Sequence, residues 1–222
     1  MKTKILHSTA VSLLVTITAV LVSVPGWSQD ANTLLNEVSN KVRAYDNIEI
    51  EFKYNLENNK EKVSQEARGN VTLEGDKYVL NMLGTTTLFD GSKTYTIVPE
   101  DEEVTIAKAD PSDDKTITPS RMLTFYENGY RSSMDITQNV RGRKIQFVKL
   151  VPIDTNAEIK DILLGIDQQT KHIYKLIQTD DNGTRYTLTV NSFKTDQQLS
   201  STLFSFDQAK YEDLGYYINK LN

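Results

Sequence analysis

The chain has 222 residues, of which 38% are hydrophobic and 25% are charged, and its formal net charge is −5. This apolar content is enough for a packed core in one domain or two, and it argues against a disordered chain. The absence of cysteine excludes disulfides, thiolate metal sites, cysteine nucleophiles and a lipid anchor on a terminal cysteine. With two histidines and an acidic balance, the composition also argues against a histidine triad, a multi-histidine metal site and nucleic-acid binding.

The beginning of the chain has the pattern of an export signal. Two lysines precede a long uncharged stretch rich in Val, Leu, Ile, Ala, Ser and Thr. Gly26 and Ser28 are small residues at the −3 and −1 positions of a candidate cleavage site. We therefore predict a signal peptide over residues 1–28 and a single domain over residues 29–222. An uncleaved membrane anchor is the alternative, since about 20 apolar residues can span a bilayer, but the break at Pro25 favours cleavage.

Beyond this leader, the sequence predicts one amphipathic helix and then a long series of strands. Residues 31–45 carry apolar side chains at helical spacing. Residues 48–56 alternate strictly between apolar and polar side chains, which predicts a strand with one solvated face. Further strands are predicted at 65–74, 78–83, 85–89, 93–98, 103–108, 132–138, 143–151, 159–167, 171–179 and 184–193, with a short apolar run at 203–206.

The remaining segments are a polar loop, a short helix and a tail without a clear pattern. Residues 109–117 form the polar loop. Thr118 and Pro119 are typical of an N-cap and a first helical residue, and Gly129 of a helix end, so a helix is expected between them. The apolar residues of the tail, 211–221, do not assign it to a helix or a strand. About eleven strands joined by tight turns predict an antiparallel meander, built as a sandwich, a barrel or a half-closed sheet covered by helices.

No motif in the sequence assigns catalysis. It contains no G-x-S-x-G elbow, no P-loop, no G-x-G-x-x-G and no H-E-x-x-H. We interpret His172 as a surface residue, and the acidic residues at 100–103 and 113–114 as solvated turns rather than cation sites. The basic cluster at 141–144 fits an exposed strand edge better than a phosphate site or a partner site. No cofactor and no metal are expected.

Apolar surface is the remaining candidate for a function. A strongly curved sheet has a concave face, and helices that cover this face loosely would leave a lipid cavity. Helices that cover it tightly would leave only a core. Periodicity alone does not separate these two outcomes.

Four features, in their order along the chain, resemble the LolA family of periplasmic lipoprotein carriers. A leader without a lipobox cysteine precedes an amphipathic helix and the alternating strand at 48–56. Gly69 opens a stretch that resembles the family's G-x-apolar-x-apolar segment. Residues 89–99, FDGSKTYTIVP, resemble the family's S-D-G-K-x-x-W-x-Y-x-P block. The C-terminal matches are 166–167, 170, 173, 182–183, 186 and 204–206.

Two features depart from the family pattern. The family's corner between two strands carries Lys-Arg-Pro, and its arginine is associated with holding the lid closed. Here that corner is Glu74-Gly75-Asp76, so no arginine can be carried over. Thr72 and Tyr95 stand where the family has tryptophans on the strands.

The resemblance implies a mainly β (α+β) fold, an open antiparallel half-barrel of about eleven strands covered by a few short helices. Its concave face would shield acyl chains. The residues expected to line this cavity are Ile50, Phe52, Tyr54, Val71, Leu73, Tyr78, Leu80, Met82, Phe89, Tyr95 and Ile97. The short helix would act as a lid, and it carries Met122, Leu123, Phe125 and Tyr126.

The function that follows from the resemblance is a soluble periplasmic carrier that moves lipoproteins from the inner to the outer membrane, without catalysis. Its partners would be acylated lipoproteins, an inner-membrane lipoprotein-releasing ABC transporter and an outer-membrane acceptor. The carrier is expected to be a monomer. The alternative is a LolA-like binding domain that senses lipid or lipoprotein in the cell envelope.

Overall fold

The computed structural model describes residues 26–109 and 118–221. The predicted signal peptide therefore lies almost entirely outside the described residues, and so does most of the predicted polar loop with residues 113–114. The helices are α1 (Gly26–Arg43) and α2 (Gln208–Asp213), with short 3-10 turns η1 (Arg121–Leu123) and η2 (Phe125–Glu127). The strands are β1 (Ile48–Asn58), β2 (Val63–Glu74), β3 (Lys77–Met82), β4 (Thr85–Phe89), β5 (Lys93–Val98), β6 (Glu103–Lys108), β7 (Tyr130–Val140), β8 (Arg143–Pro152), β9 (Ile159–Asp167), β10 (Ile173–Asp180), β11 (Arg185–Thr195) and β12 (Tyr217–Leu221).

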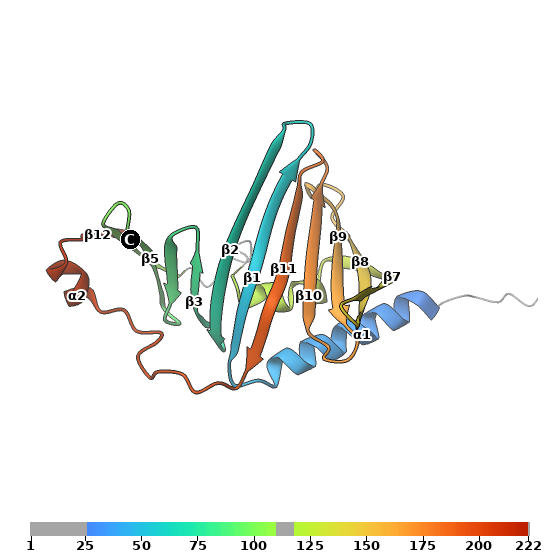
Figure 1. Ribbon diagram of the computed structural model, residues 1–222, viewed down its shortest axis with the longest axis horizontal. Coiled ribbons are helices and arrows are strands. Elements are labelled where there is room, and N and C mark those ends of the chain that lie inside the picture. The colour runs from blue at the N-terminus through green and yellow to red at the C-terminus, as the bar shows by residue number, and fades with distance from the viewer. Residues whose placement is uncertain (1–25, 110–117, 222) are drawn as a thin grey trace, which may run out of the picture.

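The strands form one open sheet with the order β12-β6-β5-β4-β3-β2-β1-β11-β10-β9-β8-β7 (Figure 1). The expected mainly β fold and its eleven antiparallel strands are confirmed. The tail without a clear pattern forms a twelfth strand, β12, which pairs with β6 in the parallel direction. The apolar run at 203–206 is not a strand, and it lies in the long connection from β11 to α2.

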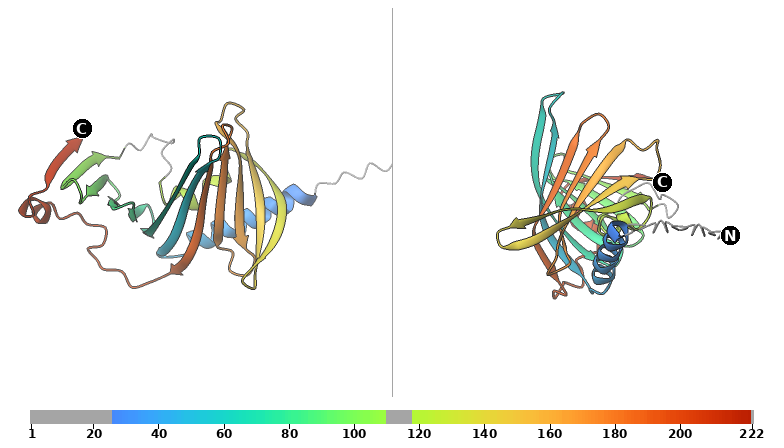
Figure 2. Two further views of the ribbon diagram at one scale, coloured as in Figure 1. Left: turned by 45° about the horizontal axis from the view of Figure 1, so that its top comes forward. Right: turned by 90° about the vertical axis from the view of Figure 1, so that its right-hand side faces the viewer.

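Helix α1 lies across the concave face of the sheet, which curves around it (Figure 2). The predicted helix at 31–45 is thus confirmed, although it begins earlier and ends slightly earlier. Its apolar stripe is Ala31, Leu34, Leu35 and Val38, and all four side chains are buried. They pack against the fully buried row of β8 and β9, Val148, Leu150, Leu164 and Ile166. This part of the concave face is therefore solid core.

The sheet buries its other face at the far end, in β4, β5 and β6. Cross-strand partners share a face, and the register pairs Val79 with Leu88 and Leu88 with Tyr95. Val79 points away from the concave face because its neighbours Tyr78 and Leu80 point toward it. The second core cluster therefore lies on the outer face, where the chain segment from β11 to β12 covers it with Phe206 and other residues.

The short helix predicted between Thr118 and Gly129 is instead two 3-10 turns, η1 and η2. The Thr118 hydroxyl does accept a hydrogen bond from the Arg121 amide, at 3.3 Å, as a cap would. At Thr124, φ is −138° and ψ is 5°, which lies outside the helical region and ends η1 before an α-helical turn can follow. Gly129 has φ of +84°, the left-handed conformation expected of a glycine after a helical segment.

Candidate functional site

A cavity of about 360 Å³ lies on the concave face, beside the part that α1 fills. Strands β1, β2, β3, β10 and β11 form its wall, and residues 119–123 cover it. The lining side chains are Ile50, Phe52, Tyr54, Val71, Leu80, Met82, Pro119, Met122, Leu123, Ile173, Leu176, Gln178, Tyr186, Leu188, Val190 and Phe193. This volume is near the lower end of the range of about 300–1,000 Å³ typical of ligand pockets. The concave face is thus core under α1 and hollow next to it.

Eight of the residues predicted from the sequence line this cavity. They are Ile50, Phe52, Tyr54, Val71, Leu80, Met82, Met122 and Leu123. Five others belong to the surrounding core cluster without lining the cavity: Leu73, Tyr78, Phe89, Phe125 and Tyr126.

The structure places the predicted cavity residues Tyr95 and Ile97 elsewhere, in the second cluster on the outer face of the sheet. The ring of Tyr95 stacks on Phe206 with 4.4 Å between the ring centroids. The prediction for these two residues is wrong because the sheet buries its concave face at β3 but its outer face at β5. The alternation of apolar and polar side chains in the sequence is the same in both cases.

Sequence reasoning missed half of the wall, which β10 and β11 provide. The alternation of Tyr186, Leu188 and Val190 is visible in the sequence, but nothing local indicates that β11 pairs with β1. The register shifts by one residue opposite Phe52, so that Asn191 is an extra residue in β11. This bulge brings Phe193 to the cavity face, where simple alternation would turn it outward.

Gly69 allows the ring of Phe52 to lie close against β2. A Cβ atom at position 69 would lie 2.6 Å from Cζ of Phe52 and 2.8 Å from the carbonyl oxygen of Asn81. Both distances are too short for a real side chain. The glycine at this position therefore sets the depth of the cavity wall.

Polar contacts join α1 to residues 126–127, which directly follow the segment that covers the cavity. The Ser39 hydroxyl donates a hydrogen bond of 3.1 Å to the Tyr126 hydroxyl, and both side chains are buried. Burial raises the pKa of Tyr126 to about 12. Next to this contact, Arg43 forms an ion pair with Glu127 that is largely exposed on the arginine side. The hydrogen bond to Arg43 is the main cause that lowers the pKa of Glu127.

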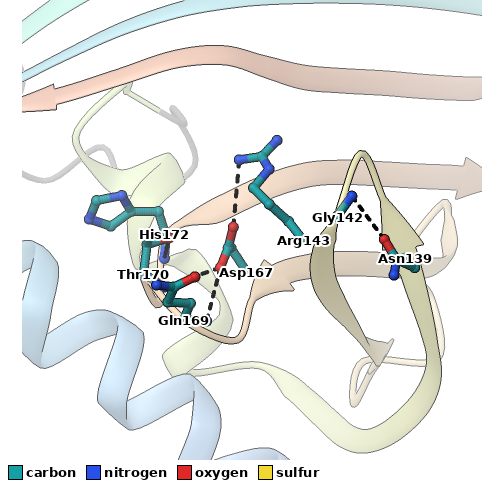
Figure 3. Close-up of polar contacts among 7 residues, drawn as sticks. All are labelled: Asn139, Gly142, Arg143, Asp167, Gln169, Thr170 and His172. Carbon is teal, nitrogen blue, oxygen red and sulfur yellow. Dashed lines mark hydrogen bonds and ion pairs between the residues drawn. The ribbon is translucent and has the colours of Figure 1, made fainter.

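A network of polar groups orders the turn between β9 and β10 (Figure 3). Asp167 is buried, and its Oδ1 atom accepts hydrogen bonds from the amides of Gln169 and Thr170 at 2.9 and 3.1 Å. Its Oδ2 atom lies 3.5 Å from the guanidinium of Arg143, which also lies over the ring of Tyr174. The Asp167 carboxylate therefore orders the turn and pairs with Arg143, which are structural roles.

The same turn places His172 against Tyr45, just beyond the end of α1, so the side chain is partly buried and not the exposed surface residue that we expected. Its ring is partly buried, stacks on Phe193 at 4.0 Å and forms a 2.8 Å hydrogen bond with the Tyr45 hydroxyl. Burial lowers the pKa of His172, and the nearby charge of Lys41 adds to this effect. His172 thus supports a lining residue of the cavity from behind.

Other candidate sites are weaker. A larger depression of about 580 Å³ lies near the turn between β3 and β4, but it is open to solvent and its wall carries charged and amide side chains, Glu51, Arg68, Asn70 and Asn81. Within residues 26–109 and 118–221, no group of three or more acidic or histidine side chains is arranged to hold a metal ion. In the same ranges, no helix is both long and apolar enough to cross a membrane.

The fold and its site define a class: an open half-barrel with an apolar, ligand-sized cavity under a short cover. The family model "Outer membrane lipoprotein carrier protein LolA" matches residues 43–207. The chain therefore belongs to the LolA family. No curated protein matches the sequence.

Several solved structures are similar to this chain at low identity. An uncharacterized conserved protein from Thermus thermophilus has a TM-score of 0.58 at 9% identity, with 87% of this chain and 100% of that chain covered. A putative outer membrane lipoprotein-sorting protein domain from Vibrio parahaemolyticus has a TM-score of 0.42 at 11% identity, with coverage of 80% and 97%. A LolA superfamily protein from Nitrosomonas europaea has a TM-score of 0.43 at 12% identity, with coverage of 79% and 97%. The similarity to the Thermus protein supports the fold alone.

Proposed function

We propose that this protein is a periplasmic carrier that shields the acyl chains of lipoproteins and delivers them from the inner to the outer membrane. The observation that carries the proposal is the apolar cavity of about 360 Å³ on the concave face, next to the buried core under α1. Membership of the LolA family supports the choice of lipoproteins as cargo. In this proposal, residues 1–28 are a cleaved signal peptide and residues 29–222 are one carrier domain.

The energetics of acyl chains explain why such a carrier needs a cavity with a movable cover. Each methylene group exposed to water costs about 0.8 kcal/mol, so a chain of a dozen methylenes costs about 10 kcal/mol. The cavity wall can offset this cost without any specific polar contact. Met82 and Met122 add adaptable contacts at the strand wall and at the cover.

Loading and release then depend on how firmly the cover is held. Its polar ties to α1 include a buried hydrogen bond between Ser39 and Tyr126 and an exposed ion pair between Arg43 and Glu127. Such contacts contribute about 1 kcal/mol and about 0–1 kcal/mol, respectively. Leu123 and Tyr126 also pack into the main core, so cargo or a membrane partner must offset this packing as well for the cover to open. These contacts would perform the closing role that the family assigns to the arginine missing at Gly75.

The proposed partners follow from this function. Cargo would come from an inner-membrane lipoprotein-releasing ABC transporter and pass to an outer-membrane acceptor. The protein would act as a monomer, and the proposal includes no catalytic step, no cofactor and no nucleic acid.

The test is recovery of acylated lipoproteins with the mature protein from cell-envelope extract, followed by release to outer-membrane vesicles. Val190→Glu puts a charge into the cavity wall, and we expect it to abolish recovery. Thr189→Glu is the matched control, because Thr189 points to the opposite face, where it pairs with Lys53 and Lys175. A folded Val190→Glu variant that still binds lipoproteins would refute the cavity as the binding site. Wild-type protein that never solubilises a lipoprotein would refute the carrier function, and binding without release would support a sensor instead.

A further inference from the structure

One end of the cavity is polar, whereas the rest of its lining is apolar. Tyr54, Gln178 and Tyr186 are the lining residues with polar groups, and they lie together. Gln178 is the cross-strand partner of Tyr186, and the rings of Tyr54 and Tyr186 are 6.4 Å apart between centroids. An elongated ligand with a polar head and an apolar tail would therefore have one preferred direction.

A carboxylate lies directly behind this polar end. The side-chain amide of Gln178 donates a hydrogen bond of 2.8 Å to Oδ1 of Asp180. Burial, followed by the carboxylates of Asp180 and Glu158, raises the pKa of Tyr186. The pKa of Tyr54 is raised mainly by burial, and the nearby charges of Tyr186 and Asp180 raise it further. Both tyrosine hydroxyls thus experience a negative electrostatic potential.

We propose that the cavity selects acyl chains whose head group is uncharged and donates hydrogen bonds, such as an amide, and discriminates against chains that end in a carboxylate. This inference rests on the proposed function, because it concerns the same cavity. The head group lies against Tyr54, Gln178 and Tyr186, and the chain runs toward the cover at Met122 and Leu123.

The chemistry of the polar end explains the selection. An amide N–H can donate to the tyrosine oxygens or to the side-chain oxygen of Gln178, and its carbonyl can accept from the tyrosine hydroxyls. A carboxylate head can only accept, and it would add a second negative charge near Asp180.

Isothermal titration with a matched pair of ligands tests this inference. N-lauroylglycine is anionic at neutral pH, and its C-terminal amide is identical except for the lost charge. We expect the amide to bind on the order of tenfold more tightly, since like charges within several ångströms produce a difference of this size in partly screened surroundings. Free fatty acids would show the same disadvantage.

Asp180→Asn keeps the shape and the acceptor for Gln178 but removes the charge, and it should bring the two affinities to within about twofold, mainly by improving binding of the acid. Asp181→Asn removes the neighbouring, more exposed carboxylate and should keep the wild-type preference. Equal binding of both ligands to the wild type, or an unchanged preference in Asp180→Asn, would overturn the inference and leave the carrier function standing. If neither ligand binds, the proposed function itself fails.

Discussion

Tyr126→Phe removes the hydroxyl that ties the cover of the cavity to α1. The tie is a hydrogen bond of 3.1 Å to Ser39, and its two side chains are only 4% and 1% exposed. A buried neutral hydrogen bond contributes about 0.5–1.5 kcal/mol net. We therefore expect the free energy of unfolding to fall by about 1 kcal/mol. By contrast, Arg43→Gln should cost less than about 1 kcal/mol, because the arginine side chain is 55% exposed and solvent screens its ion pair.

Urea unfolding measures the stability, and stopped-flow binding of a fluorescent acyl ligand measures the opening of the cover. Loss of about 1 kcal/mol that acts only in the closed state raises the open population about fivefold, and the association rate with it. Tyr130→Phe removes a hydroxyl from a neighbouring aromatic residue of the same region and should leave the association rate unchanged. The reasoning is refuted if Tyr126→Phe changes neither quantity, or if it changes stability while the association rate stays at the wild-type value.

Alkaline unfolding gives an independent check on the same residue. The pKa of Tyr126 is raised from 10.0 to about 12, mainly by burial, so the folded state favours the neutral phenol. This contribution to stability is complete below pH 10 and is lost as the pH rises toward 12. Tyr126→Phe should remove part of the alkaline decline. A smaller decline should remain, because the pKa of Tyr95 is also raised to about 12.

Three further predictions concern the wall, the supporting turn and the outer face. Gly69→Ala should lower the free energy of unfolding in urea by about 1–3 kcal/mol and lower acyl affinity, because the new methyl group would collide with the backbone carbonyl of Asn81. An unchanged urea midpoint would contradict this steric argument. Burial lowers the pKa of His172, so the unfolded state binds the proton at a higher pH than the folded state does. The melting temperature should therefore fall as the pH drops below 6.5. His172→Gln should make this fall less steep, and an identical slope in the variant would contradict the prediction. Phe206→Ala removes the stack on Tyr95 and should lower the free energy of unfolding by about 1–3 kcal/mol. The residues after 196 should become sensitive to limited proteolysis, while acyl binding is retained. Loss of acyl binding in a folded variant would show that the two faces of the sheet are coupled.

Local periodicity was sufficient to predict most of the elements. The stripe of Ala31, Leu34, Leu35 and Val38 and the alternation along β1 depend only on how side chains project from a helix or a strand. The turn residues between the apolar runs are also local signals, and they indicated about eleven antiparallel strands. The resemblance to the LolA family, applied to these apolar positions, located eight of the cavity residues, which lie on β1, β2, β3 and η1.

What the sequence by itself determined was therefore the set of elements and which side of each element is apolar. The tertiary structure alone decided which elements meet. The pairing of β1 with β11, the extra residue Asn191 and the pairing of the tail with β6 all join residues far apart in the chain. The cavity depends on the same distant contacts, since α1 fills one part of the concave face and leaves the adjoining part open. An apolar side chain is apolar in either place, and only the packing around it makes the difference between a core and a binding site.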